Sequence, residues 1–380
     1  MKNKKIIISI VSIISVLVIA LVLTFSIGYT QLINSQEELF ENNHNVMVRH
    51  LNSSNKSPNL WYDNIILLIG DGMGFNQIEA TKKELGLSQL FMETLPSKSK
   101  SQTRSYDNKI TDSAAGATAL ATGYRTYNGE ISKLGTKNLK TITNFAQDLN
   151  KKTGIVTTDD TYGATPAAFS SLSIKRSYYK TIVKGQAESN VDYIVGSNVS
   201  GSGIDKNYNK LVDNNYTIIK NYSDLPTHSN GKYYGVIDNL YSKYESENNI
   251  ELVDVAKNAI EFLDNENGFF LMIEGARIDK NNHKNNLEGM TKELYDFDKT
   301  VEYCVNWAQT KGHTLVIVTA DHESGGLIEN NGEYTYTTTK HTGDDVPLFV
   351  YGANLTNDSY MNVNIFSLML WALERKPIQI

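Results

Sequence analysis

The sequence has little cysteine, little proline and no excess of positive charge. A single cysteine excludes an intrachain disulfide. Six prolines and 26 glycines among 380 residues exclude a long Pro/Gly-rich linker. With 36 basic and 42 acidic residues the net charge is −6, so the basic excess typical of duplex nucleic-acid binders is missing and we expect no nucleic-acid partner. Because 40% of the residues are hydrophobic and 21% are charged, the composition excludes a wholly disordered or fibrous chain.

The first thirty residues have the pattern of a membrane signal. Three lysines within residues 2–5 precede the uncharged stretch 6–28, in which Ile, Val and Leu dominate. About 20 apolar residues span a bilayer as a helix, and this stretch exceeds the apolar region of about 7–15 residues in an ordinary signal peptide. We therefore predict that residues 1–30 form an uncleaved transmembrane anchor, with a cleaved signal and a buried core helix as the alternatives.

The charges that flank this segment predict its orientation. No Lys or Arg follows it until Arg49, whereas three glutamates stand within residues 37–41. The positive-inside rule then places the N-terminus in the cytoplasm and the rest of the chain outside, as a single-pass membrane protein, or as a secreted or periplasmic one if the segment is cleaved. Residues 31–60 are polar, so we expect a stalk there, followed by a globular domain over residues 61–380.

Several short apolar runs of strand length are each followed by side chains that can bind a cation. Continuous apolar runs of this kind predict strands buried on both faces, as in parallel sheets. These runs are 64–70 before Asp71, 153–158 before Asp159 and Asp160, 268–273 before Glu274, and 314–320 before Asp321 and His322. One further run, 346–351, instead comes after a candidate ligand, His341.

Helical periodicity lies between these runs. Apolar residues spaced by three or four from Met290 to Ala308 form one stripe, and Gly312 fits the cap behind that helix. Cys304 lies on the stripe, so we interpret it as a core residue rather than a nucleophile. Alternating strands and helices predict an α/β fold with a large, mostly parallel central sheet and helices on both faces.

In such sheets ligands collect beyond the carboxyl ends of the strands, so Asp71, Glu274 and Asp321 are expected to meet. Carboxylates beside a histidine such as His322 crowd together only where a cation neutralises them. The spacing therefore predicts a metal cluster.

Two further segments add candidate ligands. Asp279 and His283 stand at i and i+4, so on a helical turn they share a face and can hold one ion. His341 lies in a loop bounded by Gly343 and would supply a third donor.

Ser113 is the candidate nucleophile. It stands near the start of 111–123, a stretch of very small residues that reads as a helix. Taken alone, this stretch also fits a tightly packed buried helix. In the functional interpretation, the positive end of the helix dipole at Ser113 favours a phosphate, and a metal ion bound to the Ser oxygen makes it an alkoxide.

Six separate blocks, in order over about residues 64–351, resemble the alkaline phosphatase family. They are Gly70–Gly74, Thr111–Ser113, Ala164–Ala168, Glu274–His283, Thr319–His322 and His341–Gly343. The resemblance implies an alkaline-phosphatase-like catalytic domain over 61–380 that hydrolyses phosphate monoesters of a broad range to alcohol and inorganic phosphate, through a phosphoserine at Ser113. It also implies a homodimer, although the chain is compact between its motifs.

The resemblance further assigns two Zn²⁺ ions, one Mg²⁺ ion and two phosphate-binding residues. Arg176 would clamp phosphate, since a guanidinium matches two of its oxygens; a solvated surface charge is the alternative. Asp112 is expected to position Arg176 or to cap the helix. The implied ligands are Asp279, His283 and His341 for one zinc, Asp71, Asp321 and His322 for the other, and Asp71, Thr165 and Glu274 for magnesium, with Lys280 as a further substrate-binding residue.

The chain departs from the family pattern at Gly163. Many relatives carry Asp or His there, two residues before the Thr or Ser that binds magnesium. In some relatives the lysine at the place of Lys280 reaches phosphate through water and pairs with that acid. Lacking such an acid, Lys280 is expected to be mobile or to aim directly at phosphate, and the magnesium site is expected to be weaker.

Two rival functions remain open at this point. A related superfamily hydrolase would act on phosphodiesters or sulfate esters, and assays of the three ester types would separate it. A non-catalytic phosphate- or metal-binding protein would show a broken ligand set, whereas every expected ligand position is filled here.

Overall fold

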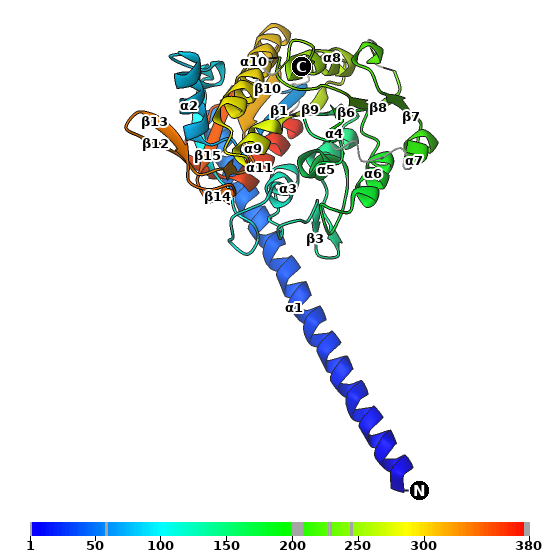
Figure 1. Ribbon diagram of the computed structural model, residues 1–380. Helices are drawn as coiled ribbons and strands as arrows, with labels where there is room; N and C mark the ends of the chain where they lie inside the picture. Colours follow the sequence, from blue (N-terminus) through cyan, green and yellow to red (C-terminus); the bar gives the residue numbers. More distant parts are fainter. Residues whose placement is uncertain are drawn as a thin grey trace. The chain divides into compact units, whose positions relative to one another are not determined.

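The computed structural model describes residues 2–57, 60–199, 208–226, 228, 230–243 and 246–375, and the side chains of residues 1–17, 19–21, 23 and 25 are not described. The chain divides into two compact units, Met1–Asn43 and His44–Ile380. The first unit is the N-terminal part of helix α1 (Lys2–Ser54), and the second contains all other elements (Figure 1).

The second unit is built on ten strands in one sheet, with six short strands beside it. The sheet strands are β1 (Asn64–Gly70), β2 (Ser97–Gln102), β5 (Lys152–Thr157), β6 (Tyr193–Ser197), β7 (Tyr216–Ile219), β8 (Lys232–Ile237), β9 (Phe269–Gly275), β10 (Thr314–Thr319), β15 (Val346–Tyr351) and β16 (Ser359–Met361). The short strands are β3 (Lys133–Leu134), β4 (Lys137–Asn138), β11 (Glu323–Ser324), β12 (Leu327–Asn330), β13 (Glu333–Tyr336) and β14 (His341–Thr342).

Helices alternate with these strands along the chain. The α-helices after α1 are α2 (Phe75–Leu85), α3 (Ser113–Thr122), α4 (Ile142–Asp148), α5 (Ala164–Ser170), α6 (Tyr179–Glu188), α7 (Tyr208–Asp213), α8 (Leu252–Leu263), α9 (Arg277–Asn282), α10 (Leu287–Lys311) and α11 (Asn362–Glu374). Within the described residues, the 3-10 helices are η1 (Phe91–Thr94) and η3 (Tyr222–Asp224).

The central sheet has the order β16-β2-β15-β10-β1-β9-β5-β6-β8-β7. Strand β1 lies between β10 and β9 and is parallel to both, with Leu67 opposite Ile317 on one side and Met272 on the other. Only β15 runs antiparallel to its two neighbours, β10 and β2, among the strand pairs of the described sheet. The predicted large and mostly parallel sheet is confirmed.

Helices cover both faces of this sheet, which is why its central strands are apolar throughout (Figure 1). Ile66 and Leu68 of β1 belong to one buried cluster with residues of α8 and α10. Ile65 and Leu67 point to the opposite face because side chains alternate along a strand, and they are just as fully buried. On that face Phe169 of α5 stacks on Phe270 of β9 with ring centroids 6.1 Å apart, so α5 packs on the sheet there.

Helix α10 follows the predicted apolar stripe and ends at the expected cap. It spans Leu287–Lys311, and Gly312 follows it with a positive φ of 73°. Cys304 is fully buried on the inner face of this helix, and its burial raises the pKa of the thiol. The interpretation of Cys304 as a core residue is confirmed.

The last turns of α1 belong to the second unit. Leu51 is buried, the Trp371 indole donates to Asn52 Oδ1 at 2.9 Å, and the Asn354 backbone N–H donates to Asn55 Oδ1 at 2.8 Å. The compact unit therefore begins at His44, and the expected limits of stalk and domain stay a prediction. Among the described residues, no helix combines the length and apolar character that crossing a membrane requires, and most side chains of the predicted anchor lie outside the described residues.

Helix α3 approaches the loop after β10 so closely that only glycine fits between them. A Cβ added to Gly116 would lie 2.7 Å from the carbonyl oxygen of Asp321 and 3.2 Å from its Cβ. This contact fixes the helix that begins at Ser113 against the loop that carries His322.

We predict that Gly116→Ala lowers the free energy of unfolding by about 1–3 kcal/mol, as overpacking of a rigid contact usually does. Helix propensity alone predicts the opposite sign, a gain of roughly 1 kcal/mol. Urea denaturation decides between them, with Gly343→Ala as the control because its added Cβ would have only one neighbour within 4 Å, Ile110 at 3.9 Å. An unchanged or raised midpoint for Gly116→Ala would show that α3 can move away from Asp321.

Candidate active site

Acidic side chains from three adjacent strands meet at one edge of the sheet. Asp71 follows β1, Glu274 lies near the end of β9, and Asp321 with His322 follows β10. These strands are neighbours and run parallel, so their carboxyl ends lie together. All four side chains are buried. The structure thus brings together the residues whose convergence the sequence predicts.

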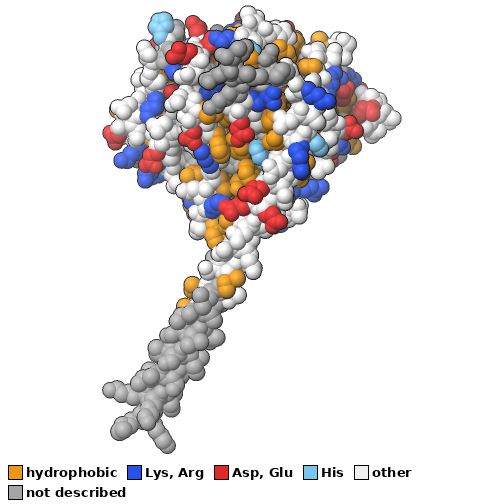
Figure 2. Space-filling view, turned by 180° about the vertical axis from the view of Figure 1, so that it is seen from behind, with side chains coloured by type: hydrophobic (Ala, Val, Ile, Leu, Met, Phe, Trp, Pro, Cys, Tyr) orange, Lys and Arg blue, Asp and Glu red, His pale blue; other side chains and the backbone are white. Residues whose placement is uncertain are grey.

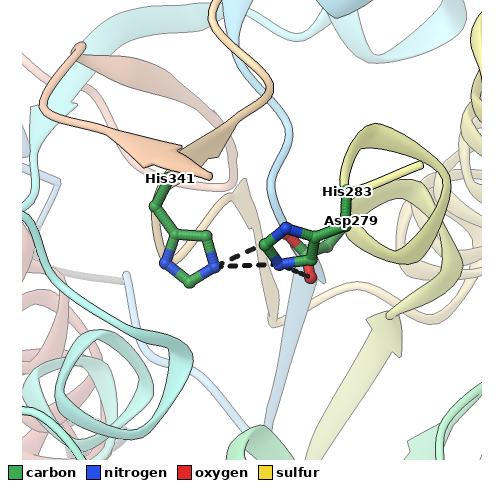
Figure 3. Close-up of side chains that lie close together, drawn as sticks. All are labelled: Asp279, His283 and His341. Carbon is green, nitrogen blue, oxygen red and sulfur yellow. Dashed lines mark hydrogen bonds and ion pairs between the residues drawn. The ribbon is translucent and has the colours of Figure 1, made fainter. Parts of the chain in front are cut away.

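A first group of candidate metal ligands consists of Asp279, His283 and His341 (Figure 3). Asp279 of helix α9 and His283, the residue that caps the end of this helix, lie on one side of it. Their side chains approach to 3.2 Å, and His341 reaches them from β14. His341 Nε2 lies 3.2 Å from His283 Nε2 and 3.8 Å from Asp279 Oδ1. Asp279 and His283, which the i, i+4 spacing predicts to lie on one side of a helix, therefore lie next to His341, as expected.

Backbone carbonyls orient both of these histidines. His283 Nδ1 lies 2.7 Å from the Thr339 carbonyl oxygen, and His341 Nδ1 lies 2.9 Å from that of Thr111. A carbonyl only accepts, so each Nδ1 carries the proton and each Nε2 faces the shared space, which is the arrangement of metal-binding histidines.

A second group consists of Asp71, Asp279 and His322, all buried. His322 Nε2 lies 3.5 Å from Asp71 Oδ1 and 3.4 Å from Asp321 Oδ2. Asp279 therefore belongs to both groups and lies between them. The strand-end reasoning did not place Asp279 beside His322, because that proximity depends on how α9 returns to the sheet edge.

Ser113 is the first residue of α3 and points at the second group. Its Oγ lies 3.1 Å from His322 Nε2, and the residue is buried. The very small residues of α3 are all buried too, so α3 is a tightly packed buried helix. This packing is compatible with the functional interpretation of Ser113.

Asp112 fulfils both of the roles expected for it. Its Oδ1 accepts the backbone N–H of Ala115 at 3.0 Å, which caps α3, and that of Gly129 at 3.1 Å. Its Oδ2 accepts from Arg176 Nη1 at 3.2 Å. The guanidinium is thereby paired with the residue that precedes Ser113, and the charges of Asp71 and Asp321 also act on it. Its phosphate-binding role stays a prediction.

Glu274 and Thr165 form the remaining part of the predicted ligand set. Glu274 accepts a short hydrogen bond from the Thr157 hydroxyl. Thr165 lies in the first turn of α5, a helix that contacts β9; its buried hydroxyl makes no hydrogen bond of good geometry, although it lies close enough to Glu274 to lower the pKa of that carboxyl. An unpaired buried hydroxyl is costly unless a ligand completes it.

Lys280 corrects one expectation. It is neither unpaired nor aimed freely at the site, because its Nζ donates to Asp159 Oδ1 at 2.7 Å. Because Gly163 has no side chain, the Asp159 carboxylate can occupy the space beside it. A Cβ at Gly163 would lie 2.7 Å from Asp159 Oδ2.

The pKa shifts show how strongly the carboxyls oppose one another. Burial, together with the charges of Asp321, Asp279 and Glu274, raises the pKa of Asp71 well above its usual value. Burial and the charge of Asp279 raise the pKa of Asp321 to about 7. Burial and then the charge of Asp159 raise the pKa of Glu274 to about 8.

The histidines shift in opposite directions. The hydrogen bond to Asp279 raises the pKa of His283 to about 9, against the effect of burial. Burial and the neighbouring His341 lower the pKa of His322 well below its usual value. Burial alone would raise the pKa of Asp279, but the hydrogen bond with His283 and the charges of the histidines lower it.

The residues present fit divalent cations. Asp71 Oδ1, Asp321 Oδ2 and Thr165 Oγ1 are buried without a hydrogen-bond partner. Carboxylates this close tolerate burial when a cation completes them, and His nitrogen with carboxylate oxygen is a donor set for ions such as Zn²⁺ or Mg²⁺. The family resemblance and this donor set point to divalent metals.

Sequence reasoning missed Ser324 and assigned no role to Asp159. Ser324 donates a short hydrogen bond to Asp279 Oδ1 and lies 3.4 Å from His322 Nδ1, and no pattern in the sequence distinguishes it. Asp159 did carry a signal, since it follows a predicted strand as Asp71 and Asp321 do.

Comparison with known proteins identifies the family. The alkaline phosphatase family profile matches residues 62–207 and 196–336. The chain is 33% identical over 307 residues to alkaline phosphatase 4 of Bacillus subtilis and 30% identical over 298 residues to alkaline phosphatase 3 of the same organism. These matches cover 74% and 72% of this chain but only 66% and 64% of the two relatives' own length.

Solved structures give the same result. The alkaline phosphatase of the Antarctic bacterium TAB5 has a TM-score of 0.73 at 29% identity, covering 83% of this chain and 99% of that one. A variant of that enzyme with Mg bound in its M3 site has a TM-score of 0.74 at 28% identity, with the same coverage. The family profile matches more than half of the chain, and these relatives and structural neighbours are alkaline phosphatases, so the chain belongs to the alkaline phosphatase family.

Proposed function

We propose that the chain hydrolyses phosphate monoesters to an alcohol and inorganic phosphate through a phosphoserine at Ser113, with a broad substrate range. One observation carries this proposal: Ser113 Oγ lies 3.1 Å from His322, within the second of two ligand groups that share Asp279. A serine hydroxyl is a weak nucleophile, and a surrounding set of metal ligands is one of the few environments that activate it.

The proposed reaction consists of two successive displacements at phosphorus. Ser113 Oγ attacks phosphorus, the ester P–O bond breaks, and the alcohol leaves with a proton. Water then attacks the phosphoserine, the bond from phosphorus to Oγ breaks, and Ser113 regains its proton. Throughout, Arg176, held by Asp112, binds two phosphate oxygens through its forked N–H groups, and the N-terminus of α3 favours the negative charge.

The proposed cofactors are two Zn²⁺ ions and one Mg²⁺ ion. One zinc would be held by Asp279, His283 and His341. When bound, such cations lower the pKa of the hydroxyl and of water and offset the charge on the leaving oxygen. The second zinc would be held by Asp71, Asp321 and His322, and the magnesium by Asp71, Thr165 and Glu274.

The proposed location is the outer side of a cell membrane, with residues 1–30 as the anchor, or free outside the cytoplasm if that segment is cleaved. The three lysines before the apolar stretch support this orientation. We expect protease added to intact cells to remove the 61–380 domain. Protection from that protease, together with digestion after lysis, would contradict this location.

A homodimer is proposed from the family. We expect light scattering of the soluble domain to give a mass twice that of the monomer.

Replacing the nucleophile tests the covalent mechanism. Ser113→Ala is expected to lower kcat for a chromogenic phosphate monoester by about 10³-fold or more, because the other hydroxyl beside His322, that of Ser324, donates to Asp279 and is not placed to replace Ser113. Ser99→Ala is the control, since its hydroxyl bonds the Asn357 carbonyl oxygen at 2.9 Å, in a part of β2 that carries no predicted ligand. Rates with a phosphodiester and a sulfate ester are measured in parallel.

Two outcomes would count against the proposal. Retained monoester turnover in Ser113→Ala would rule out the phosphoserine, and faster turnover of the diester or the sulfate ester by the unmodified chain would favour the related hydrolases instead.

Removing the metals is expected to make the stability of the protein fall as the pH rises. The folded-state pKa values of Asp321 and Glu274, about 7 and about 8, exceed their unfolded values of roughly 4, so the folded state retains protons that the unfolded chain has lost. His283, at about 9, likewise contributes stability that is full below about 6.5 and is lost through pH 9.

All three shifts act in the same direction, whereas the lowered pKa of His322 acts in the opposite direction only below about pH 7. Thermal unfolding of the chelated protein between pH 7 and 9 is therefore expected to show a falling Tm, and added Zn²⁺ and Mg²⁺ to raise Tm more at pH 9 than at pH 7. A metal-free Tm that is constant or rises over this window would show that these carboxyls are not crowded as described.

A further inference from the structure

Gly163 is not required by the backbone. It precedes α5 with φ of −52° and ψ of 160°, a conformation open to most residues. The nearest group that excludes a larger residue is the neighbouring carboxylate, since an added Cβ would lie 2.7 Å from Asp159 Oδ2 and 3.1 Å from Asp159 Cγ; the Asp160 carbonyl oxygen, at 3.0 Å, also limits the space. The side chain of Asp159 therefore occupies the space that a residue at position 163 would fill.

The backbone of Asp159 is fixed between two strands. Its N–H donates to Thr157 Oγ1 at 2.9 Å, and its carbonyl oxygen accepts from the Ser197 N–H, at the end of β6, at 2.8 Å. A Cβ on Gly196 would lie 2.7 Å from that same carbonyl oxygen. A carboxylate on so constrained a segment is well suited to hold another side chain in place.

The carboxylate of Asp159 faces the candidate active site. Its Oδ1 accepts from Lys280 Nζ at 2.7 Å, and the two side chains are partly buried. Lys280 follows Asp279 directly, and its ammonium also interacts with the charges of Asp71 and Glu274. Thr157 links the two acids, because its hydroxyl bonds both Glu274 and the Asp159 N–H.

We propose that Asp159 is a positioning residue of this site: its ion pair restrains Lys280 from approaching the bound phosphate more closely, and its carboxylate gives the cation site at Thr165 and Glu274 the negative charge that Gly163 does not supply. The inference rests on the proposed function and goes beyond it by assigning a role to a residue outside the ligand set. Asp159 partly neutralises Lys280, which weakens the hold on the product phosphate.

The test compares Asp159→Asn with Asp160→Asn in the zinc-loaded protein. Asp160 is the neighbouring acid, and its Oδ1 accepts from the Val199 N–H at 3.2 Å rather than from Lys280. Two quantities are measured: the affinity for Mg²⁺ by calorimetry and the inhibition constant of inorganic phosphate. For Asp159→Asn we expect Mg²⁺ affinity to fall by about 10–100-fold, as for other groups that support a metal site, and the inhibition constant to fall severalfold.

A double variant that moves the carboxylate from position 159 to position 163 tests whether a loss of Mg²⁺ affinity results merely from misfolding. Asp159→Ala combined with Gly163→Asp is expected to recover most of the Mg²⁺ affinity, since the acid then comes from the adjacent position. Gly163→Asp alone is expected to destabilise the protein, because the new side chain meets Asp159 Oδ2. The two substitutions would thus compensate for each other.

The proposal is overturned if Asp159→Asn matches Asp160→Asn in both Mg²⁺ affinity and phosphate inhibition, or if the double variant binds Mg²⁺ no better than Asp159→Ala. Monoester turnover distinguishes this failure from failure of the proposed function, because loss of the Asp159 role leaves the Ser113 reaction in place.

Discussion

The burial of several carboxylates close together is the constraint on which this structure depends. Asp71, Glu274 and Asp321 lie at the ends of three neighbouring strands, out of contact with bulk water. Burial raises the pKa of each, and the charges of neighbouring carboxylates, Asp279 and Asp159 among them, raise these pKa values further. Such an arrangement would be unstable at neutral or alkaline pH without positive charge. Protons supply that charge in the metal-free protein, and divalent cations replace them most effectively where protons are scarce.

The fold concentrates these groups at one place because parallel strands share a direction. Helices on both faces remove water from the sheet, and the strand ends then open into one edge where β14, α9 and α3 add their side chains (Figure 1). Outside the site, basic and acidic side chains are interspersed over the face seen in Figure 2. The same edge contains Ser113, its neighbour His322 and the Asp112–Arg176 pair, which are the groups of the proposed reaction.

Much of this site is predictable from sequence because its ligands follow local rules. An acid after an apolar run marks a strand end, as for Asp71 and Asp321, and the i, i+4 spacing of Asp279 and His283 marks a helix face. The pairing of Lys280 with Asp159 obeys no local rule, since the two residues are 121 positions apart and meet only through the tertiary fold. The position of Asp279 between both ligand groups is unpredictable for the same reason.

The central claim is that these side chains bind metal ions around Ser113. Anomalous diffraction at the zinc edge, from crystals of the full chain grown with Zn²⁺ and an unreactive phosphate analogue, measures this directly. The account predicts one zinc peak among Asp279, His283 and His341 and a second beside His322, Asp71 and Asp321, with the analogue between Ser113 and Arg176. Zinc at unrelated surface sites, with neither group occupied, would contradict it.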